Sequence, residues 1–234
     1  MQKQLSELIE RTKAAFGDHL VSAILYGSAA MQDWDQRNSD LNVLCVLDRI
    51  SPEELASSEP IFRWWREKGS PPPLLLTAEE VRTATDCFPM EFHDMQEHRR
   101  VLFGADIVKE LEIDRSFYRA QVEHELRAKQ IRLRQKAAEV LSSSEQLTKL
   151  LTDSISTFCV LGRHGLILSG REARWKKAEI VSALEEAMQV QLPAFNEILA
   201  IRGSSKQAAS GTSLLGQYLA DVDALVRFVD ALEK

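Results

Sequence analysis

Along the first half of the chain, the spacing of hydrophobic residues switches between helical and strand-like periods. Leu5, Leu8 and Ile9 recur at helical spacing, so residues 2–16 are expected to form an amphipathic helix. Two short, largely apolar runs follow at residues 19–26 and 41–47, and they predict buried strands. The further expected elements are a helix at 52–68, a strand at 74–76, a brief helix from 77, a strand at 88–95 and a short strand at 100–103.

Two of these helices carry start signals in the sequence. Ser51 precedes Pro52 and two glutamates, which is the pattern of a capping residue, a proline at the first helical position and acids in the first turn. Thr77 is followed three residues later by Glu80, which fits a capping box. The order of helices and strands predicts a small α/β domain at residues 1–112.

The second half of the chain shows helical periodicity throughout. Strand signals stop after about residue 112, and short polar or glycine- and proline-containing breaks separate the periodic segments. Several helices with short connections predict an all-α helical bundle domain at residues 113–234. The expected helices cover residues 115–141, 146–168, 174–190, 193–202 and 212–232.

Composition and charge limit the classes of function. The chain has 234 residues, 44% of them hydrophobic, and a net charge of −6, which does not favour nonspecific binding to nucleic acid or to an acidic membrane. The N-terminal residues are charged and amphipathic, and no apolar run reaches the length of a membrane span. Cys45, Cys87 and Cys159 lie far apart among apolar neighbours, which predicts buried free thiols in a reducing, cytoplasmic environment.

Candidate chemistry lies in Gly27-Ser28 and in Asp40-Leu41-Asn42. Gly27 ends a predicted strand and has no Cβ to keep a ligand from its backbone. Ser28 is expected to begin a helix, where free N–H groups favour phosphate oxygens. Asp40 and Asn42 are two positions apart on a predicted strand, so both side chains project from one face. Two oxygen ligands facing a phosphate cradle could hold a magnesium ion that bridges to a nucleoside triphosphate.

This arrangement resembles the nucleotidyltransferase superfamily, the group of kanamycin nucleotidyltransferase and DNA polymerase beta. The resemblance rests on Leu25-Tyr26-Gly27-Ser28-Ala29-Ala30 and on Asn38-Ser39-Asp40-Leu41-Asn42-Val43-Leu44. It implies an α/β domain with a mixed sheet and a metal-dependent enzyme that uses Mg²⁺ or Mn²⁺. Such an enzyme transfers a nucleoside monophosphate from a nucleoside triphosphate to a hydroxyl, while two metals activate the attacking hydroxyl and stabilise the leaving pyrophosphate.

The resemblance also implies a third carboxylate from a later strand. If residues 88–95 form that strand, alternation places Met90 and Phe92 in the core and Glu91 on the exposed face. Glu91 is therefore the expected third metal ligand, or the base for the acceptor hydroxyl. Asp94 takes its place if a bulge shifts the register.

Asn42 departs from the family pattern, which has a second aspartate at this position. An amide offers one neutral carbonyl oxygen, so a magnesium site loses a full negative charge, and hard divalent cations prefer charged oxygens. Two hypotheses follow for the chain. It is a nucleotidyltransferase with impaired catalysis, or it is an inactive nucleotide-binding or regulatory protein on the same fold.

Several cations are candidates for binding a triphosphate. Arg37 lies in the predicted loop before Asp40 and could reach the phosphates. Arg163 and His164 interrupt an apolar helix, so the cation needs an acidic partner or a bound anion.

The second half of the chain is similar in layout to the helical domain of bacterial antibiotic-modifying relatives. That similarity implies an acceptor held against the helices, and a homodimer is also compatible with a helical bundle. The sequence does not identify the acceptor.

Overall fold

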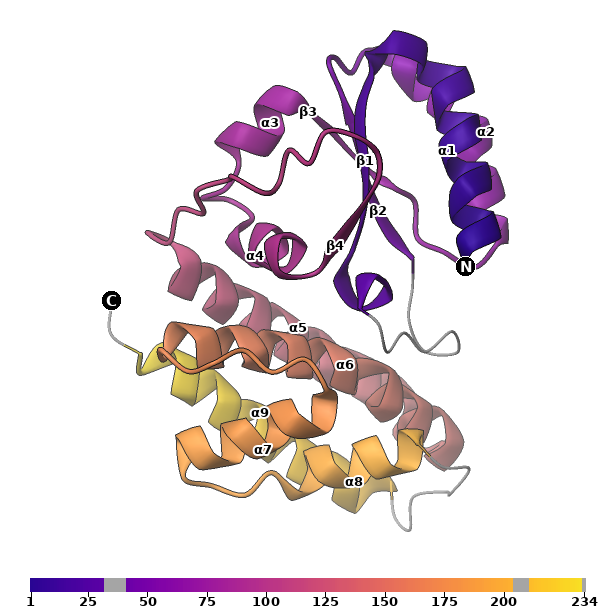
Figure 1. Ribbon diagram of the computed structural model, residues 1–234. Coiled ribbons are helices and arrows are strands. Elements are labelled where there is room, and N and C mark those ends of the chain that lie inside the picture. The colour runs from indigo at the N-terminus through magenta and orange to yellow at the C-terminus, as the bar shows by residue number, and fades with distance from the viewer. Residues whose placement is uncertain (32–40, 204–210, 233–234) are drawn as a thin grey trace. The chain divides into compact units, whose positions relative to one another are not determined.

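The chain divides into two compact units, Met1–Arg115 and Ser116–Lys234. The computed structural model describes residues 1–31, 41–203 and 211–232. In Figure 1 the first unit contains a sheet with helices, and the described part of the second contains helices and no strand. The protein therefore combines a mixed α/β unit with an all-α unit.

The first unit is built on a four-stranded mixed sheet with the strand order β3-β2-β1-β4. The central strand β1 (Leu20–Tyr26) pairs antiparallel with β2 (Asn42–Leu47) and with β4 (Arg99–Gly104). The edge strand β3 (Leu74–Thr77) pairs parallel to β2. Each of these strands coincides with a run predicted from the sequence.

Helices cover both faces of this sheet (Figure 1). α1 (Gln2–Phe16) and α2 (Pro52–Glu67) pack on one face, and α3 (Ala78–Thr83) and α4 (Pro89–Glu97) pack on the other. Successive residues of a strand point to opposite faces, so β1 and β2 supply side chains to both cores. The first core includes Leu5, Leu8, Leu25, Val43 and Trp65, and the second includes Ile24, Leu44, Val46, Phe92 and Met95.

The predicted start signals of α2 and α3 are confirmed. The Ser51 hydroxyl accepts a hydrogen bond from the Glu53 backbone N–H, while the Glu54 carboxylate accepts one from the Ser51 N–H at 2.9 Å. Thr77 and Glu80 exchange the same two kinds of bond at the start of α3. These bonds satisfy N–H groups that have no partner within the helix.

The predicted strand at residues 88–95 is wrong, because this segment forms the helix α4. Pro89 stands in the first turn of α4, where its missing N–H costs nothing. Phe92 and Met95 are both buried and lie three residues apart, which is helical rather than strand spacing. A short apolar run does not distinguish the two periods, and tertiary packing decides between them.

The second unit is a bundle of helices. α6 (Ser144–Leu168) is its centre and packs against α5 (Tyr118–Val140) and the remaining helices. The other described helices are α7 (Lys177–Met188), α8 (Pro193–Arg202) and α9 (Gly211–Asp230). The core includes Leu126, Leu133, Ile155, Phe158, Phe195 and Tyr218. All of these helices coincide with segments predicted from the sequence.

Two further expectations concern the cysteines and the membrane. Cys45 and Cys159 are buried free thiols, but Cys87 is exposed, so the prediction of three buried thiols is wrong for that residue. Cys87 lies in the short connection between α3 and α4, where the sheet does not cover it. Among the described helices, none has the length and hydropathy that a membrane span requires.

Candidate functional site

A sharp backbone turn follows the central strand. Gly27 has a φ of +74°, in the left-handed region that favours glycine, and its N–H donates to the carbonyl oxygen of His98 at 3.1 Å. The turn is the 3-10 helix η2 (Gly27–Ala30), and the Ser28 side chain is exposed. The expected helix start at Ser28 is therefore only one turn long. Its dipole is small, because few peptide units are aligned.

Asn42, Tyr26 and Arg99 form a row across three neighbouring strands at the end of β1. Tyr26 lies directly opposite Asn42 on β2 and opposite Arg99 on β4. Residues directly opposite each other in an antiparallel pair share one face of the sheet. Tyr26 packs against the core cluster of α3 and α4, so the row is on the α4 face of the sheet.

Asn42 also lies close to the turn. A Cβ added to Gly27 would lie 3.6 Å from the Asn42 side-chain nitrogen Nδ2. The side chain of Asn42 is therefore adjacent to the backbone of the turn.

Glu91 lies near this row even though its strand assignment was wrong. It is an exposed residue in the first turn of α4. Burial raises the pKa of Tyr26 above its ordinary value, and the negative charge of Glu91 raises this pKa further. A charge acts on the phenol in this way only at short range, so Glu91 is a neighbour of Tyr26.

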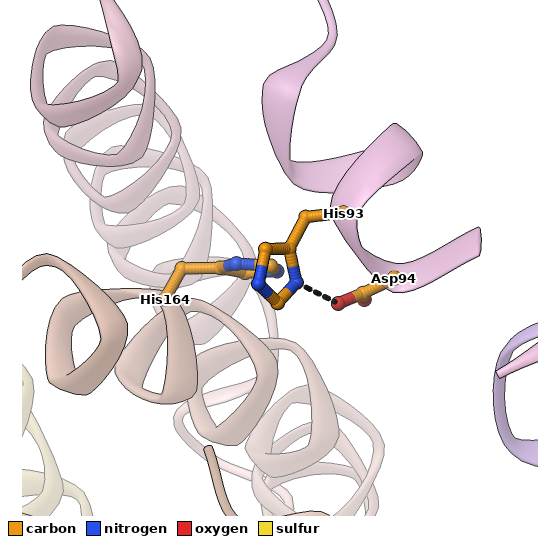
Figure 2. A group of neighbouring side chains, drawn as sticks. All are labelled: His93, Asp94 and His164. Carbon is orange, nitrogen blue, oxygen red and sulfur yellow. Dashed lines mark ion pairs between the residues drawn. The ribbon is translucent and has the colours of Figure 1, made fainter. Parts of the chain in front are cut away.

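Asp94, the alternative third carboxylate, has a different environment. Its side chain is 19% exposed, and its carboxylate lies 3.9 Å from Nδ1 of the adjacent His93 (Figure 2). Both residues belong to α4. Both carboxylates therefore lie on α4, and the negative charge of Glu91 contributes to the raised pKa of Tyr26.

Two predicted site residues, Asp40 and Arg37, lie outside the described residues, as does the predicted loop at 32–38. The fit of a metal ion is therefore judged on Asn42 and Glu91. Carboxylate and amide oxygens are the donor types that Mg²⁺ and Mn²⁺ take, so the donor set suits such an ion. Asn42 contributes no charge, which makes the set weaker than a pair of aspartates.

The ion pair of Arg99, a residue of this row, was not predicted from the sequence. Nε of Arg99 donates to both carboxylate oxygens of Asp106, at 2.8 and 3.0 Å, and the guanidinium also bonds the Gln96 carbonyl oxygen. The charge of Arg99 is thus compensated within the first unit. The sequence interpretation did not include this pairing.

The second unit contains the buried cation that the sequence singled out. Arg163 is 4% exposed, and its guanidinium carbon lies 3.9 Å from the centre of the Trp175 ring. This is a cation–π contact, which the sequence interpretation did not include. The adjacent His164, also drawn in Figure 2, is buried, and its Nδ1 lies 2.6 Å from the Tyr118 hydroxyl.

Comparison with known proteins identifies the fold. Spectinomycin adenyltransferase AAD(9) from Enterococcus faecialis, whose crystal structure contains ATP and spectinomycin, is similar to this chain with a TM-score of 0.65. The similarity covers 98% of this chain and 99% of that chain, with 16% sequence identity. The protein has a nucleotidyltransferase fold. No protein-family model matches the sequence, and no curated protein matches it either.

Proposed function

We propose that this chain is a metal-dependent nucleotidyltransferase. It binds a nucleoside triphosphate at the end of β1 and transfers the nucleoside monophosphate to a hydroxyl of a small molecule or protein. The observation that carries the proposal is the proximity of three features in the first unit. These features are the left-handed turn at Gly27, the side chain of Asn42 beside it, and the charge of Glu91 acting on Tyr26.

In this proposal the turn and Arg37 bind the phosphates. Gly27 presents backbone without a side chain, which lets a phosphate approach closely. The exposed hydroxyl of Ser28 donates a hydrogen bond to a phosphate oxygen. Arg37 adds a positive charge.

Asp40, Asn42 and Glu91 would hold the divalent ion, Mg²⁺ or Mn²⁺. When bound, the ion supplies charge neutralisation for the phosphates and lowers the pKa of a hydroxyl that it contacts. Asn42 supplies an uncharged oxygen, so the ion is held less tightly than by two aspartates and Asp40 contributes more of the binding. Strong dependence on Asp40 is therefore expected.

Glu91 is the proposed acceptor of the proton from the attacking hydroxyl. It is exposed, so a substrate can reach its carboxylate. Burial and the charge of Glu91 keep Tyr26 protonated, which leaves Glu91 as the basic group of this pair. Glu91 can accept this proton whether or not it also coordinates the ion.

The similar structure supports the class of reaction. That protein is an adenyltransferase and was crystallised with ATP and spectinomycin, which are a nucleotide donor and a small-molecule acceptor. At 16% identity the likeness concerns the fold, so the base of the nucleotide and the acceptor of this chain are open to experiment.

A second function is favoured by Asn42. The chain would bind a nucleotide as a regulatory signal and would not transfer it, because the amide weakens the metal site on which transfer depends. The substitution Asn42→Asp separates the two functions. A slow enzyme should become faster by about ten-fold or more when the missing charge returns. A regulatory protein should bind nucleotide, and neither wild type nor Asn42→Asp should release pyrophosphate.

The first experiment is calorimetric titration of the full chain with ATP, GTP, CTP and UTP. Each titration is run with Mg²⁺, with Mn²⁺ and without a divalent ion. Metal-dependent binding of at least one triphosphate is expected, and it should disappear in Asp40→Ala. Metal-independent binding would favour the regulatory function, and the absence of binding by all four nucleotides would refute both.

A further inference from the structure

A cavity of about 300 Å³ lies between two helices of the second unit, α5 and α6. All of the residues that line it belong to these helices. Arg132 and Lys136 of α5 and Asp153 of α6 are exposed, so the cavity opens to solvent and a ligand can enter it. Its volume is in the range of sites that bind small molecules.

The α5 wall of the cavity carries three cations. Lys129, Arg132 and Lys136 follow one another at helical spacing, which places them on one face of α5. Nζ of Lys129 lies 3.3 Å from a carboxylate oxygen of Glu125, so this charge is compensated. Arg132 and Lys136 make no ion pair with a residue that the structure describes. The charges of these two side chains are therefore available to a ligand.

The α6 wall of the cavity supplies hydrogen-bonding groups. Asp153 lines the same cavity as the cations, and in the described part of the chain it has no ion pair. Thr157 is half-buried, and its hydroxyl makes no hydrogen bond to another described residue. By contrast, the hydroxyls of Thr12 and Thr152, two other helical threonines, donate to the carbonyl oxygen four residues back. The carboxylate of Asp153 and the hydroxyl of Thr157 are thus both free to contact a ligand.

The charges and the apolar residues of the lining together limit the chemistry of that ligand. The chain has a net charge of −6, whereas the cavity is lined by three cations and one acid, which favours an anionic group. Asp153 disfavours a second anionic group and accepts a hydrogen bond from a hydroxyl. Leu133, Leu150 and Phe158 complete the lining, so carbon atoms of a ligand have apolar side chains to pack against.

We propose that this cavity is a binding site for a small phosphorylated molecule that also carries hydroxyl groups. Arg132 and Lys136 bind the phosphate, because a guanidinium presents several N–H donors in a planar fork that matches a phosphate group and an ammonium adds a second charge. Asp153 accepts a hydrogen bond from a hydroxyl of the same molecule. The cavity lies wholly within the second unit, so the inference does not depend on the nucleotide site proposed for the first unit.

The experiment titrates the full chain, labelled with ¹³C in the methyl groups of leucine and threonine, with three probes. Glucose 6-phosphate carries a phosphate and hydroxyls, glucuronate carries a carboxylate and hydroxyls, and glucose carries hydroxyls alone. The methyl signals of Leu150 and Thr157 report binding at the cavity itself. We expect saturable shifts with glucose 6-phosphate, weaker binding of glucuronate, which has a smaller charge, and no shifts with glucose at the same millimolar concentration.

A double substitution tests the cationic wall. Arg132→Gln combined with Lys136→Gln removes both charges, and affinity for glucose 6-phosphate should fall by about ten-fold or more, since hydrogen bonds to charged groups are lost. Both residues are exposed and glutamine is a good helix former, so the unfolding temperature should stay close to that of wild type. The control combines Arg134→Gln with Lys149→Gln, two exposed cations of the same helices that do not line the cavity. It removes the same net charge and should bind as wild type does.

The outcomes decide for or against the site. Saturable shifts at Leu150 and Thr157 with glucose 6-phosphate, lost in the cavity variant and kept in the control, support the inference. Equal affinity of the cavity variant and the control overturns it, as does equal binding of glucose and glucose 6-phosphate. Tighter binding of glucuronate than of glucose 6-phosphate overturns the assignment of a phosphate, and the absence of shifts at these two residues with either anion overturns the site.

Discussion

Tyr26 and Asn42 lie directly opposite each other at the last pair of the β1–β2 ladder. They share the α4 face of the sheet, where the charge of Glu91 reaches the Tyr26 phenol. Immediately after Tyr26 the backbone turns at Gly27. This pair of residues therefore lies beside the turn and near the carboxylate of Glu91. Asn42 is also the position where an aspartate was expected.

Substitution of Gly27 by alanine tests the backbone requirement of the turn. The left-handed φ of +74° costs an alanine about 1–2 kcal/mol, and the new Cβ would lie 3.6 Å from the Asn42 side chain. We expect lower stability and weaker nucleotide binding, measured by denaturant unfolding and calorimetry. Gly69→Ala is the control, because Gly69 has a φ of +83° and no atom within 4 Å of its Cβ position. A Gly27 variant whose nucleotide affinity equals that of the control would contradict the placement of the ligand.

The substitution Glu91→Gln tests the contact between α4 and the central strand. Removing the negative charge should lower the pKa of Tyr26, while burial keeps it above its ordinary value. Stability linked to Tyr26 is present below its unfolded pKa and is lost as pH rises from the unfolded to the folded pKa, so this loss should be smaller and should end at lower pH in the variant. The measurement is the pH dependence of the ¹³Cζ signal of labelled tyrosine. The control is Glu97→Gln, because Glu97 is an exposed residue at the end of α4, and this variant should leave the signal unchanged. Equal titration curves in the two variants would exclude an interaction between Glu91 and Tyr26.

Acid sensitivity of the first unit is expected to depend on Glu54. The Ser51 hydroxyl bonds its carboxylate and Arg49 also donates to it, which lowers the pKa of Glu54 to about 2. A carboxyl with a lowered pKa stabilises the fold above its unfolded pKa, and this contribution disappears as pH falls through about 2. Wild type should therefore exceed Glu54→Gln in stability at neutral pH, with the difference declining below about pH 4.5. Chemical denaturation at several pH values measures this difference in stability. The control is substitution of the exposed neighbour, Glu53→Gln. A difference between wild type and Glu54→Gln that is constant from neutral pH to pH 2 would contradict the prediction.

Asp221 should have the opposite pH dependence in the second unit. Its carboxylate accepts the backbone N–H groups of Ala194 and Phe195 at the start of α8, at 2.9 and 3.2 Å. Burial nevertheless raises the pKa of Asp221 to about 6. A raised pKa means that stability is present below the unfolded pKa of about 4 and is lost as pH rises through about 6.

The comparison variant for this prediction is Asp221→Asn, whose amide oxygen still accepts hydrogen bonds and does not titrate. The stability of wild type relative to this variant should fall between about pH 4 and pH 7, by about 1–2 kcal/mol after allowance for solvent screening. Calorimetric unfolding at the two pH values measures it. A wild-type advantage that grows with pH would show that the helix-capping bonds outweigh desolvation.

Much of the fold follows from local signals in the sequence. Ser51 and Thr77 marked the starts of α2 and α3, and the apolar runs before Gly27 and after Asp40 marked β1 and β2. These features are set by residues a few positions apart, so the sequence contains the whole signal.

The errors and omissions depend on distant parts of the chain. α4 was predicted as a strand, because Met90 and Phe92 alternate with polar residues over too few positions to exclude a helix. Ser28 was expected to begin a longer helix than the single turn that forms. Arg99 was not considered for the site, since only the pairing of β4 with β1 places it opposite Tyr26.

The most direct test of the account is a titration of isotopically labelled protein with the Mg²⁺ complexes of ATP, GTP, CTP and UTP, in which the backbone amide signals are monitored. The account predicts that the largest shifts occur at Gly27, Ser28 and Asn42, at the end of β1, and that residues near His19 at the other end of the strand are unaffected. Shifts confined to other parts of the chain, or no shifts at millimolar nucleotide, would contradict it.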